Sequence, residues 1–495
     1  MGEGAASRRD RVRPVGIIDI GSNSIRLVVY DLNTRTPVPR FNEKAVCALG
    51  QNLGLTGRLD ADGVTLALAT LGRFARLAEA MNLERVEVLA TAAVRDAADG
   101  PDFVAAIERI PGLKVRVLTG GHEARLAALG VLCGTPDAEG MVADLGGGSL
   151  ELIQVHGGEV GRHATMPLGV LRLAEAGGRP RTEALIDSHL EGVPWIAAGR
   201  GGTLYVVGGA WRSIARLCIA QTGHPLMVLD NFTLERAEAV RLIDLLSLQS
   251  RKSLEKVRGI SKKRLPHLPN AALLLEKVLR AAMPSRLVFS VYGMREGQFF
   301  KMLPESLRAQ DALIAACRQL ARQSGRFPEH GDEILDWMAP LFPDESAAAR
   351  RLRHAACLLS DCFWAEHPDY RAEQAMFRVL RLPFMGMGHR DRAFLAVAIH
   401  NRHAGEDGAA QAITGLLSEE ELREARLVGL ATRLAHTLSG GVPGLIGLTR
   451  VAIEGRALVL EVPASDPAFL PELTDRRADR LARALGCDSL DMRRV

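Results

Sequence analysis

A short motif that occurs twice constrains the fold of this chain more than any other feature. Residues 19–27 read DIGSNSIRL and residues 144–152 read DLGGGSLEL, so that Asp, Gly, Ser and Leu recur at matching positions. Each copy joins two apolar runs rich in β-branched residues, which predicts a strand, a tight turn and a second strand. Because internal repeats mark repeated structural units, we expect two similar lobes with a cleft that faces both turns.

The segments around the motif alternate between helix and strand patterns. Helical periodicity is present over 62–82, 102–110 and 122–134, and strand-like runs lie at 85–91 and 113–119. This alternation indicates an α/β fold.

The last third of the chain has a different pattern. From about residue 307 it is helical, as in 307–325 and 345–367, and the end reads as a hairpin that turns at Glu454-Gly455, a helix and a final strand. We therefore expect a basic, disordered N-terminus over 1–13, a first lobe over 14–135, a second lobe over 136–305, an all-α domain over 306–438 and a small α/β domain over 439–495.

Cysteine usage and hydropathy indicate the compartment. The seven cysteines are scattered and form no CxxC pair, which argues against a disulfide framework or a zinc site. The first apolar run is interrupted by Asp19, Asn23 and Arg26, so that we expect neither a signal peptide nor a membrane span. The sequence predicts a cytoplasmic protein without a membrane partner.

The glycine turns predict phosphate binding. Without a Cβ, a phosphate can approach the backbone N–H groups of Gly146, Gly147 and Gly148. The hydroxyl of Ser149 adds a donor, and Ser22, Asn23 and Ser24 of the first turn can face the same anion. A plain glycine-rich turn is the alternative, which the duplication disfavours.

Two carboxylates lie beside the second turn. Asp144 follows a strand directly and Glu151 lies on the strand after the turn. A carboxylate there would repel a bare phosphate, and its presence makes sense if it holds Mg²⁺ or another divalent cation. We expect Asp144 and Glu151 to be metal ligands that take part in catalysis.

Several collinear motifs together resemble a known family. DIGSNSIRLVVYD, DLGGGSLEL, VVGGAWR and VYGMREG are similar to motifs of the Ppx/GppA family of exopolyphosphatases and guanosine pentaphosphate phosphatases, in order over about 14–300. The resemblance continues more weakly over 353–374. It implies two actin-like (ribonuclease H-like) lobes with a cleft, an all-α domain similar to the HD phosphohydrolase fold, a small C-terminal α/β domain and a homodimer.

The resemblance also implies roles for single residues. Thr91 and Arg95 match residues that approach the phosphates, Gly208 and Gly209 match a glycine pair that lines the cleft, and Glu123 matches the catalytic base that activates water. Each residue also has a structural alternative. Arg95 could be a surface arginine, the glycine pair a close-packed strand end, and Glu123 a residue that only complements a helix dipole.

One position departs from the family pattern. Many members carry two acidic residues in a row where this chain has His122-Glu123. The histidine either alters the local pKa or metal affinity, or is a neutral surface replacement.

A basic segment precedes the helical region. Residues 251–301 hold twelve Lys or Arg and three Glu, most densely over 256–264. A solvated basic face is the usual explanation for such a segment. A channel that binds a polyanion is the more specific hypothesis. Aromatic residues are only 4%, which argues against base stacking and nucleic acid. We expect a polyphosphate channel at Arg258, Lys262, Lys263 and Arg264.

Five histidines between 354 and 403 raise the possibility of a second metal site. They are His354, His367, His389, His400 and His403. A working HD site needs an adjacent His-Asp pair with further ligands, and the nearest matches are Ser360-Asp361 and His389-Arg390-Asp391. We therefore expect a degenerate site without metal.

Taken together, the motifs predict an exopolyphosphatase that processively releases orthophosphate from the end of inorganic polyphosphate. Removal of the 5′ γ-phosphate of guanosine pentaphosphate (pppGpp) is the alternative reaction, because it uses the same constellation. A regulatory protein that binds (p)ppGpp or polyphosphate with little turnover is the non-enzymatic alternative. An ATP-driven kinase or chaperone of the same superfamily is disfavoured, because no adenosine pocket can be located.

Overall fold

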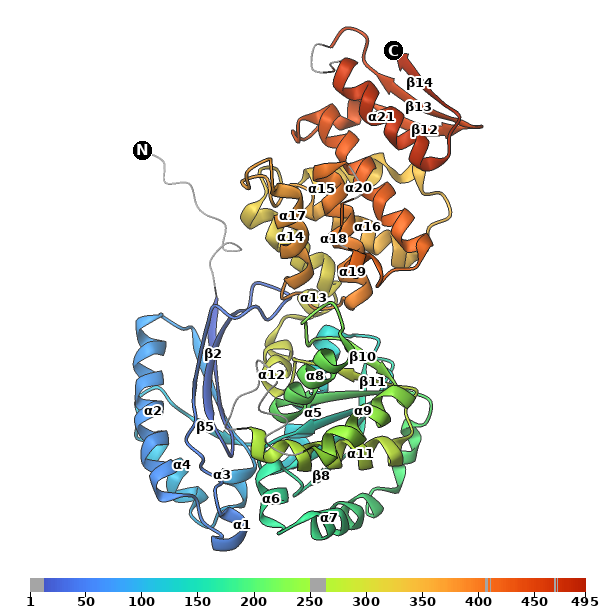
Figure 1. Ribbon diagram of the computed structural model, residues 1–495. Helices are drawn as coiled ribbons and strands as arrows, with labels where there is room; N and C mark the ends of the chain where they lie inside the picture. Colours follow the sequence, from blue (N-terminus) through green and yellow to red (C-terminus); the bar gives the residue numbers. More distant parts are fainter. Residues whose placement is uncertain (1–12, 250–263, 406–407, 410, 467–468, 470) are drawn as a thin grey trace, which may run out of the picture. The chain divides into compact units, whose positions relative to one another are not determined.

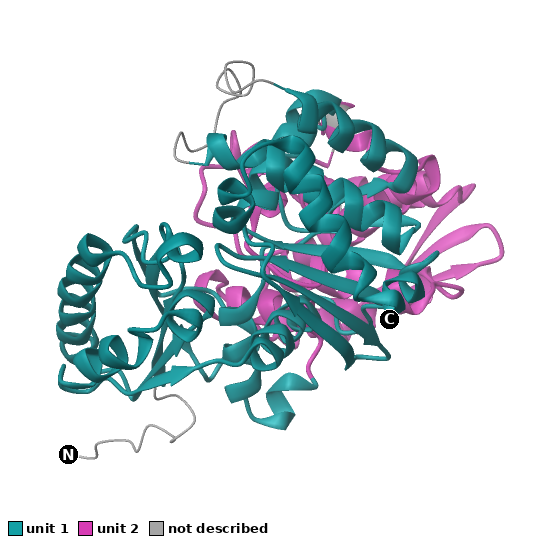
Figure 2. Cartoon of the chain, turned by 90° about the horizontal axis from the view of Figure 1, so that it is seen from below, with its two compact units in different colours: residues 1–309 teal, residues 310–495 magenta. Residues whose placement is uncertain are grey.

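The computed structural model describes residues 13–249, 264–405, 408–409, 411–466, 469 and 471–495. The chain divides into two compact units, residues 1–309 and 310–495, which are coloured separately in Figure 2. Of the expected N-terminal segment, only Arg13 is among the described residues. Three of the expected channel residues also lie outside them, namely Arg258, Lys262 and Lys263. The five predicted domain boundaries stay predictions.

The first sheet of unit 1 contains the first copy of the motif. Its order is β3-β2-β1-β4-β5, with β2 antiparallel to β1 and β3, and β4 parallel to β1 and β5. The strands are β1 (Pro14–Ile20), β2 (Ile25–Asp31), β3 (Phe41–Ala45), β4 (Arg85–Ala90) and β5 (Val115–Val117). The helices of this part are α1 (Leu53–Thr56), α2 (Ala61–Ala80), α3 (Ala92–Asp96) and α4 (Gly100–Glu108).

The second sheet repeats this topology around the second copy. Its order is β10-β11-β9-β6-β7-β8, so that β8-β7-β6-β9-β11 corresponds to β3-β2-β1-β4-β5 of the first sheet. Its strands are β6 (Gly140–Leu145), β7 (Leu150–His156), β8 (Glu159–Met166), β9 (Thr203–Gly208), β10 (Phe232–Glu235) and β11 (Arg286–Phe289). Its helices are α6 (Val170–Glu175), α7 (Arg179–Glu191), η1 (Pro194–Gly199), α8 (Gly209–Thr222), α9 (Arg236–Leu248), η2 (Leu265–His267) and α11 (Leu268–Ala282). The predicted pair of similar α/β lobes is confirmed.

Two helices lie between the sheets (Figure 1): α5 (Gly120–Gly134) and α12 (Met294–Met302). On one side, α5 packs its alanines and valine on the second sheet. On the other side, Leu126 and Phe299 join a buried cluster with the first sheet. Because helices also cover the outer face of the first sheet, β1 and β2 bury apolar side chains on both faces.

The backbones of α5 and α12 touch. A Cβ on Gly297 would lie 1.8 Å from the carbonyl oxygen of Leu126, and one on Gly130 would lie 2.2 Å from that of Gly293. Beside this contact the buried hydroxyl of Tyr30 on β2 donates to Glu296 Oε1 at 2.9 Å. These contacts connect the two lobes through the inner helices.

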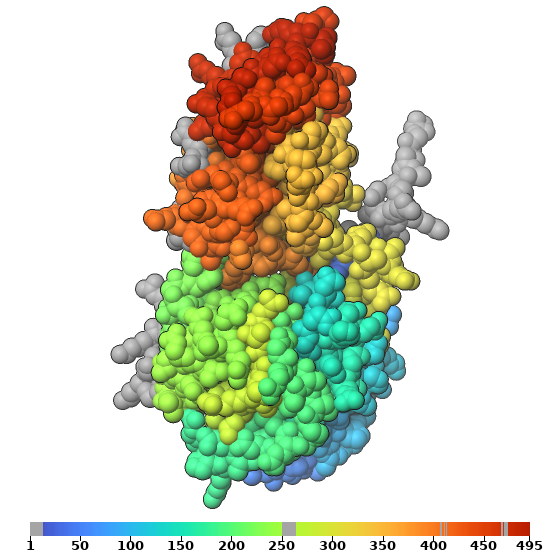
Figure 3. All heavy atoms as spheres, turned by 90° about the vertical axis from the view of Figure 1, so that its right-hand side faces the viewer, coloured from blue at the N-terminus to red at the C-terminus, as the bar shows by residue number. Residues whose placement is uncertain are grey.

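Unit 2 is helical and ends in a three-stranded sheet. Its helices are α14 (Ala312–Ser324), α15 (His330–Trp337), η3 (Ala339–Leu341), α16 (Ala347–Leu359), α17 (Arg371–Arg381), α18 (His389–Ala404), α19 (Gln411–Thr414), α20 (Glu419–Ser439) and η4 (Ile446–Leu448). The sheet consists of β12 (Arg450–Glu454), β13 (Ala457–Val462) and β14 (Ser489–Arg494), and α21 (Pro471–Leu485) connects β13 to β14. The sheet and α21 share one apolar cluster with α15 and α20. Figure 3 shows these C-terminal residues in red, packed directly on the orange helices.

Two predicted elements differ from the structure. The helix predicted over 307–325 is broken into α13 (Glu305–Arg308) and α14, because the side chain of Asp311 accepts the backbone N–H of Ile314 and starts a new helix. The helix predicted to begin at 122 begins at Gly120, since Thr119 caps it through the N–H of His122. The predicted hairpin at Glu454-Gly455 and the final strand are confirmed.

Within the part of the chain that the structure describes, no helix is long and apolar enough to cross a membrane.

The contact between α5 and α12 predicts a sharp dependence on one glycine. Gly297→Ala should lower the stability of unit 1 by about 3 kcal/mol, because its Cβ would collide with backbone that cannot move aside. Gly72→Ala is the matched control, since Gly72 lies within α2 with open space around it, and it should be neutral or stabilise by about 1 kcal/mol. Thermal and urea unfolding followed by circular dichroism measure both, and equal stability of the two variants would contradict the packing described.

Candidate active site

The two glycine turns meet face to face. Each is closed by the same hydrogen bond, from Gly21 N to Ser24 O at 3.1 Å and from Gly146 N to Ser149 O at 3.0 Å. A Cβ on Gly147 would lie 2.9 Å from the Cβ of Ser22, and one on Gly148 would lie 3.0 Å from its Oγ. The glycines of the second turn therefore allow the first turn to approach.

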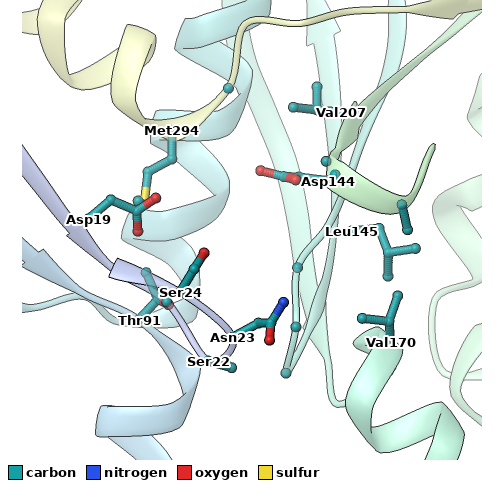
Figure 4. A pocket seen from close by; sticks show the side chains of 18 of the residues that line it. Asp19, Ser22, Asn23, Ser24, Thr91, Asp144, Leu145, Val170, Val207 and Met294 are labelled. Atoms are coloured by element: carbon teal, nitrogen blue, oxygen red, sulfur yellow. The ribbon is translucent and has the colours of Figure 1, made fainter. Parts of the chain in front are cut away.

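A pocket of about 220 Å³ opens beside this contact (Figure 4). Asp19 and Asp144, at the corresponding strand ends of the two lobes, point toward one another across it. The structure brings most of the predicted site residues into its lining, namely Ser22, Asn23, Ser24, Thr91, Glu123, Asp144, Gly146, Gly147, Gly148, Ser149, Gly208, Gly209 and Arg264. Arg95, Glu151 and His122 do not line it.

The later glycine pair starts a helix at the pocket. Gly208 has φ +111°, and a Cβ there would lie 2.3 Å from the carbonyl oxygen of Leu145. Gly209 opens α8, whose first N–H groups carry the positive end of the helix dipole. The positive φ and the close approach to Leu145 explain why glycine is needed at position 208, the end of β9.

Three buried carboxylates cluster at one side of the pocket: Asp144 and Glu123, which line it, and Glu151 behind them. Asp144 lies opposite Glu151 in the β6–β7 register, so that both are on one face of the sheet. Burial raises the pKa of Asp144 to about 6. The charge of Arg212 opposes this rise, and the charge of Asp19 adds to it. Burial and the charges of Glu123 and Asp144 raise the pKa of Glu151 well above its usual range. Glu151 Oε1 is buried and has no hydrogen-bond partner.

Glu123 lies in the first turn of α5 and is 8% exposed. Burial raises its pKa to about 7, Arg95 counteracts this, and the charge of Asp144 adds to it. Arg95 Nη1 donates to Glu123 Oε2 at 3.0 Å, and its Nε donates to Asp96 at 3.0 Å. The structure thus places Arg95 against the predicted base, where the sequence suggested a phosphate contact.

Five cations line the other parts of the pocket: Arg26, Lys44, Arg212, Arg264 and Arg295. None of them forms an ion pair with a carboxylate of the described residues. Burial, followed by repulsion from Arg295, lowers the pKa of Arg212 to about 10. A group of cations that lowers one another's pKa in this way is stabilised by a bound anion.

Sequence reasoning found only Arg264 among these cations. Arg26, Arg212 and Arg295 lie within the quoted motifs, so that their position there was a signal that could have been used. Asp19 was likewise recognisable as the counterpart of Asp144. Lys44 lies in no motif.

The two copies of the motif differ in charge at one position. Arg26 lies seven residues after Asp19, and Glu151 lies seven residues after Asp144. In the sheets, Arg26 lies opposite Asp19 on the adjacent strand, and Glu151 lies opposite Asp144 in the same way. One lobe therefore presents a cation and the other an anion at equivalent places, which suits a ligand made of phosphate and a metal ion.

The carboxylates suit a divalent cation that is shared with phosphate. Among the described residues there is no group of three or more His, Cys, Asp or Glu side chains placed to hold a metal. Mg²⁺ is commonly bound by one or two carboxylates together with substrate phosphates and water. The unpartnered Oε1 of Glu151 beside Asp144 fits this mode of binding.

In unit 2 the predicted histidines lie in different surroundings, and Nε2 of His403 is buried without a hydrogen-bond partner among the described residues. His354 Nε2 contacts Asp332 at 2.8 Å, and His367 is exposed. His389, His400 and His403 lie on α18. Ser360 Oγ contacts His436 Nε2 at 2.8 Å, and Asp361 pairs with Arg326. The absence of a metal from this region stays a prediction.

Comparison with known proteins places this geometry in a family. The family model for the Ppx/GppA phosphatase family matches residues 28–306, and that for the exopolyphosphatase C-terminal domain matches 313–490. Exopolyphosphatase 1 of Mycobacterium leprae is 28% identical over 307 residues, which are 58% of this chain and 89% of that protein. Retrograde regulation protein 2 of Saccharomyces cerevisiae is 25% identical over 454 residues, 79% and 72% of the two chains. The crystal structure of an exopolyphosphatase from Cytophaga hutchinsonii has a TM-score of 0.53 at 24% identity, covering 58% of this chain and 97% of that one.

The first family model spans more than half of the chain and contains the second glycine turn, Glu123 and four of the five pocket cations, Lys44, Arg212, Arg264 and Arg295, while the first turn and Arg26 lie just before it. The second spans most of unit 2. This chain belongs to the Ppx/GppA phosphatase family.

Proposed function

We propose that this chain hydrolyses the terminal phosphoanhydride bond of inorganic polyphosphate and releases orthophosphate. The observation that carries the proposal is the pocket itself. It joins five cations that have no ion pair among the described residues, two facing glycine turns and a cluster of buried carboxylates. The relatives named exopolyphosphatase, in Mycobacterium and Cytophaga, support the same reading.

The terminal phosphate would lie between the two turns. Backbone N–H groups at 146–149 and the hydroxyls of Ser22, Ser24 and Ser149 supply donors from both lobes. Arg26 and Arg295 supply charge beside Asp19. Donors held in place before the reaction stabilise the charge that spreads over the equatorial oxygens in the transition state.

Glu123 would activate the water. In its ionised form it accepts a proton from a water molecule, whose oxygen attacks the terminal phosphorus. The bond from that phosphorus to the bridging oxygen breaks in line, and the shortened chain leaves with the bond's electron pair. Arg95 holds the Glu123 carboxylate and favours its ionised form, so that it acts as a positioning residue.

Asp144 and Glu151 would hold the divalent cation. When bound, Mg²⁺ supplies charge neutralisation to the phosphate oxygens. The two carboxylates keep their places through the β6–β7 pairing, and their mutual repulsion is relieved by a cation between them and the substrate.

The pocket lining favours a polymer over a guanosine nucleotide. Among the described residues that line it there is no Phe, Tyr or Trp on which a base could stack. Processivity, a homodimer and binding of (p)ppGpp stay predictions.

The first prediction concerns the base. Glu123→Gln should lower the rate of phosphate release from long-chain polyphosphate with Mg²⁺ by about 10²–10⁴-fold, because the amide cannot accept the proton. Glu159→Gln, at the exposed start of β8, is the control and should match the wild type. The assay includes pppGpp in parallel. Phosphate release by the wild type from pppGpp alone would assign the alternative reaction. Tight binding by the wild type without release from either substrate would identify a regulatory binding protein.

The second prediction concerns pH. Because the ionised form of Glu123 is active and its pKa is raised to about 7, kcat/KM should rise as pH increases from 6 to 8. Arg95→Met removes the charge that favours ionisation, so that this rise should move by about one unit to higher pH. Arg109→Met, an exposed position, should leave the profile in place. A profile for Arg95→Met that coincides with the wild type would show that Arg95 does not act through Glu123.

The third prediction concerns the metal. Asp144→Asn should raise the half-saturating Mg²⁺ concentration at least about tenfold, because one ligand charge is lost. The rise should appear both in activity and in the thermal stabilisation that Mg²⁺ with pyrophosphate gives to the protein. Asp137→Asn, on an exposed turn, is the control. An unchanged Mg²⁺ dependence would remove Asp144 from the metal site.

A further inference from the structure

A row of three side chains leads from the floor of the pocket to its mouth. Asp19 on β1 pairs with Arg26 on β2, and Arg26 pairs with Lys44 on β3. Residues directly opposite one another on adjacent strands share a face of the sheet. Asp19 is desolvated, Arg26 is half-buried and Lys44 is exposed, while all three line the pocket. The row ends at Lys44, because β3 is the edge strand.

Asp19 at the other end of the row attracts Lys44, but the charges that act on it most strongly are all positive. They are Arg26 on β2, Arg264 before η2, Arg212 on α8 and Arg295 on α12. Its neighbour Glu43 is bound by Arg73 at 2.7 Å, on the opposite face of the strand. Like charges gathered around Lys44 raise the free energy of the empty pocket. An anion at the mouth is what makes a lysine at this position favourable.

The spacing of the strands says which part of a chain Lys44 would meet. Adjacent strands lie about 4.8 Å apart, so β3 is roughly 10 Å from β1 and its Asp19. The terminal phosphate would lie at the turns next to β1. Lys44 therefore faces phosphate groups beyond the one being cleaved.

We propose that Lys44 is a specificity residue that holds the polyphosphate chain where it leaves the pocket, and that it thereby favours long chains over short ones. Arg264, which donates to the carbonyl oxygen of Gly209 at 2.8 Å, would face the same part of the chain from the second lobe. The inference rests on the proposed function and adds a residue for which the sequence motifs assign no role.

The ionisation of Lys44 supports a simple check. Although the side chain of Lys44 reaches solvent, its partial desolvation in the pocket and the surrounding arginines lower its pKa to about 8. The protonated form holds the chain, so affinity for long chains is full below this pKa and falls as pH rises through it. An arginine at the same position would stay charged.

The test measures binding separately from turnover. In the Glu123→Gln background, long-chain polyphosphate and pyrophosphate are titrated by calorimetry with Mg²⁺. Lys44→Met should raise the Kd for the long chain about tenfold and leave that for pyrophosphate within twofold, which also reports an intact pocket. Lys44→Arg should bind the long chain as the parent does and lose the decline between pH 7 and 9. Lys114→Met, another exposed lysine of the same lobe, is the matched control.

The outcomes separate the two proposals. If the wild type hydrolyses polyphosphate and the Glu123→Gln chain binds it, but Lys44→Met behaves as Lys114→Met does, the role of Lys44 is wrong and the proposed function stands. An equal loss for pyrophosphate would also overturn it, because Lys44 would then act on the terminal phosphates. If the parent neither hydrolyses nor binds polyphosphate, both proposals fail together.

Discussion

The contact between the two glycine turns is the constraint on which the pocket depends. Gly147 and Gly148 lie so close to Ser22 that neither position has room for a Cβ. Behind this contact Gly130 and Gly297 let α5 and α12 touch in the same way. These two close contacts bring the C-terminal ends of β1 and β6 together at the pocket. Backbone donors of two lobes can then reach one phosphate, which a single turn could do only from one side.

The charges of the pocket follow from the same duplication. A shared ancestor motif would place identical side chains on both lobes, yet Arg26 and Glu151 occupy equivalent positions with opposite charge. The cations repel one another, as the lowered pKa values of Arg212 and Lys44 show, and the carboxylates do so as well. Within the described residues none of the five pocket cations forms an ion pair with a carboxylate, so neither group fully neutralises the other. A polyanion that arrives with a divalent cation satisfies both.

The sequence predicted those parts that local pattern determines. The turns, Asp144 and the β1–β2 and β6–β7 hairpins follow from a repeated motif, and the position of Glu123 follows from the resemblance to a family. Lys44 could not be recognised, because it faces the pocket only once β3 pairs with β2. The contact of Arg95 with Glu123 depends on how α3 and α5 pack, which no spacing in the chain reveals. The break in the predicted helix at Asp311 was visible as a capping residue but was outweighed by the continuous periodicity around it.

Hydrolysis in water enriched in ¹⁸O tests the central claim most directly. Attack by a Glu123-activated water on the terminal phosphorus places one labelled oxygen in each orthophosphate released, and leaves the remaining chain unlabelled after a single turnover. Mass spectrometry of both products reads this out. Label at the new end of the remaining chain would show attack on an inner phosphorus, and label in neither product would show that water is not the group that receives the phosphoryl group. Either result would contradict the site described.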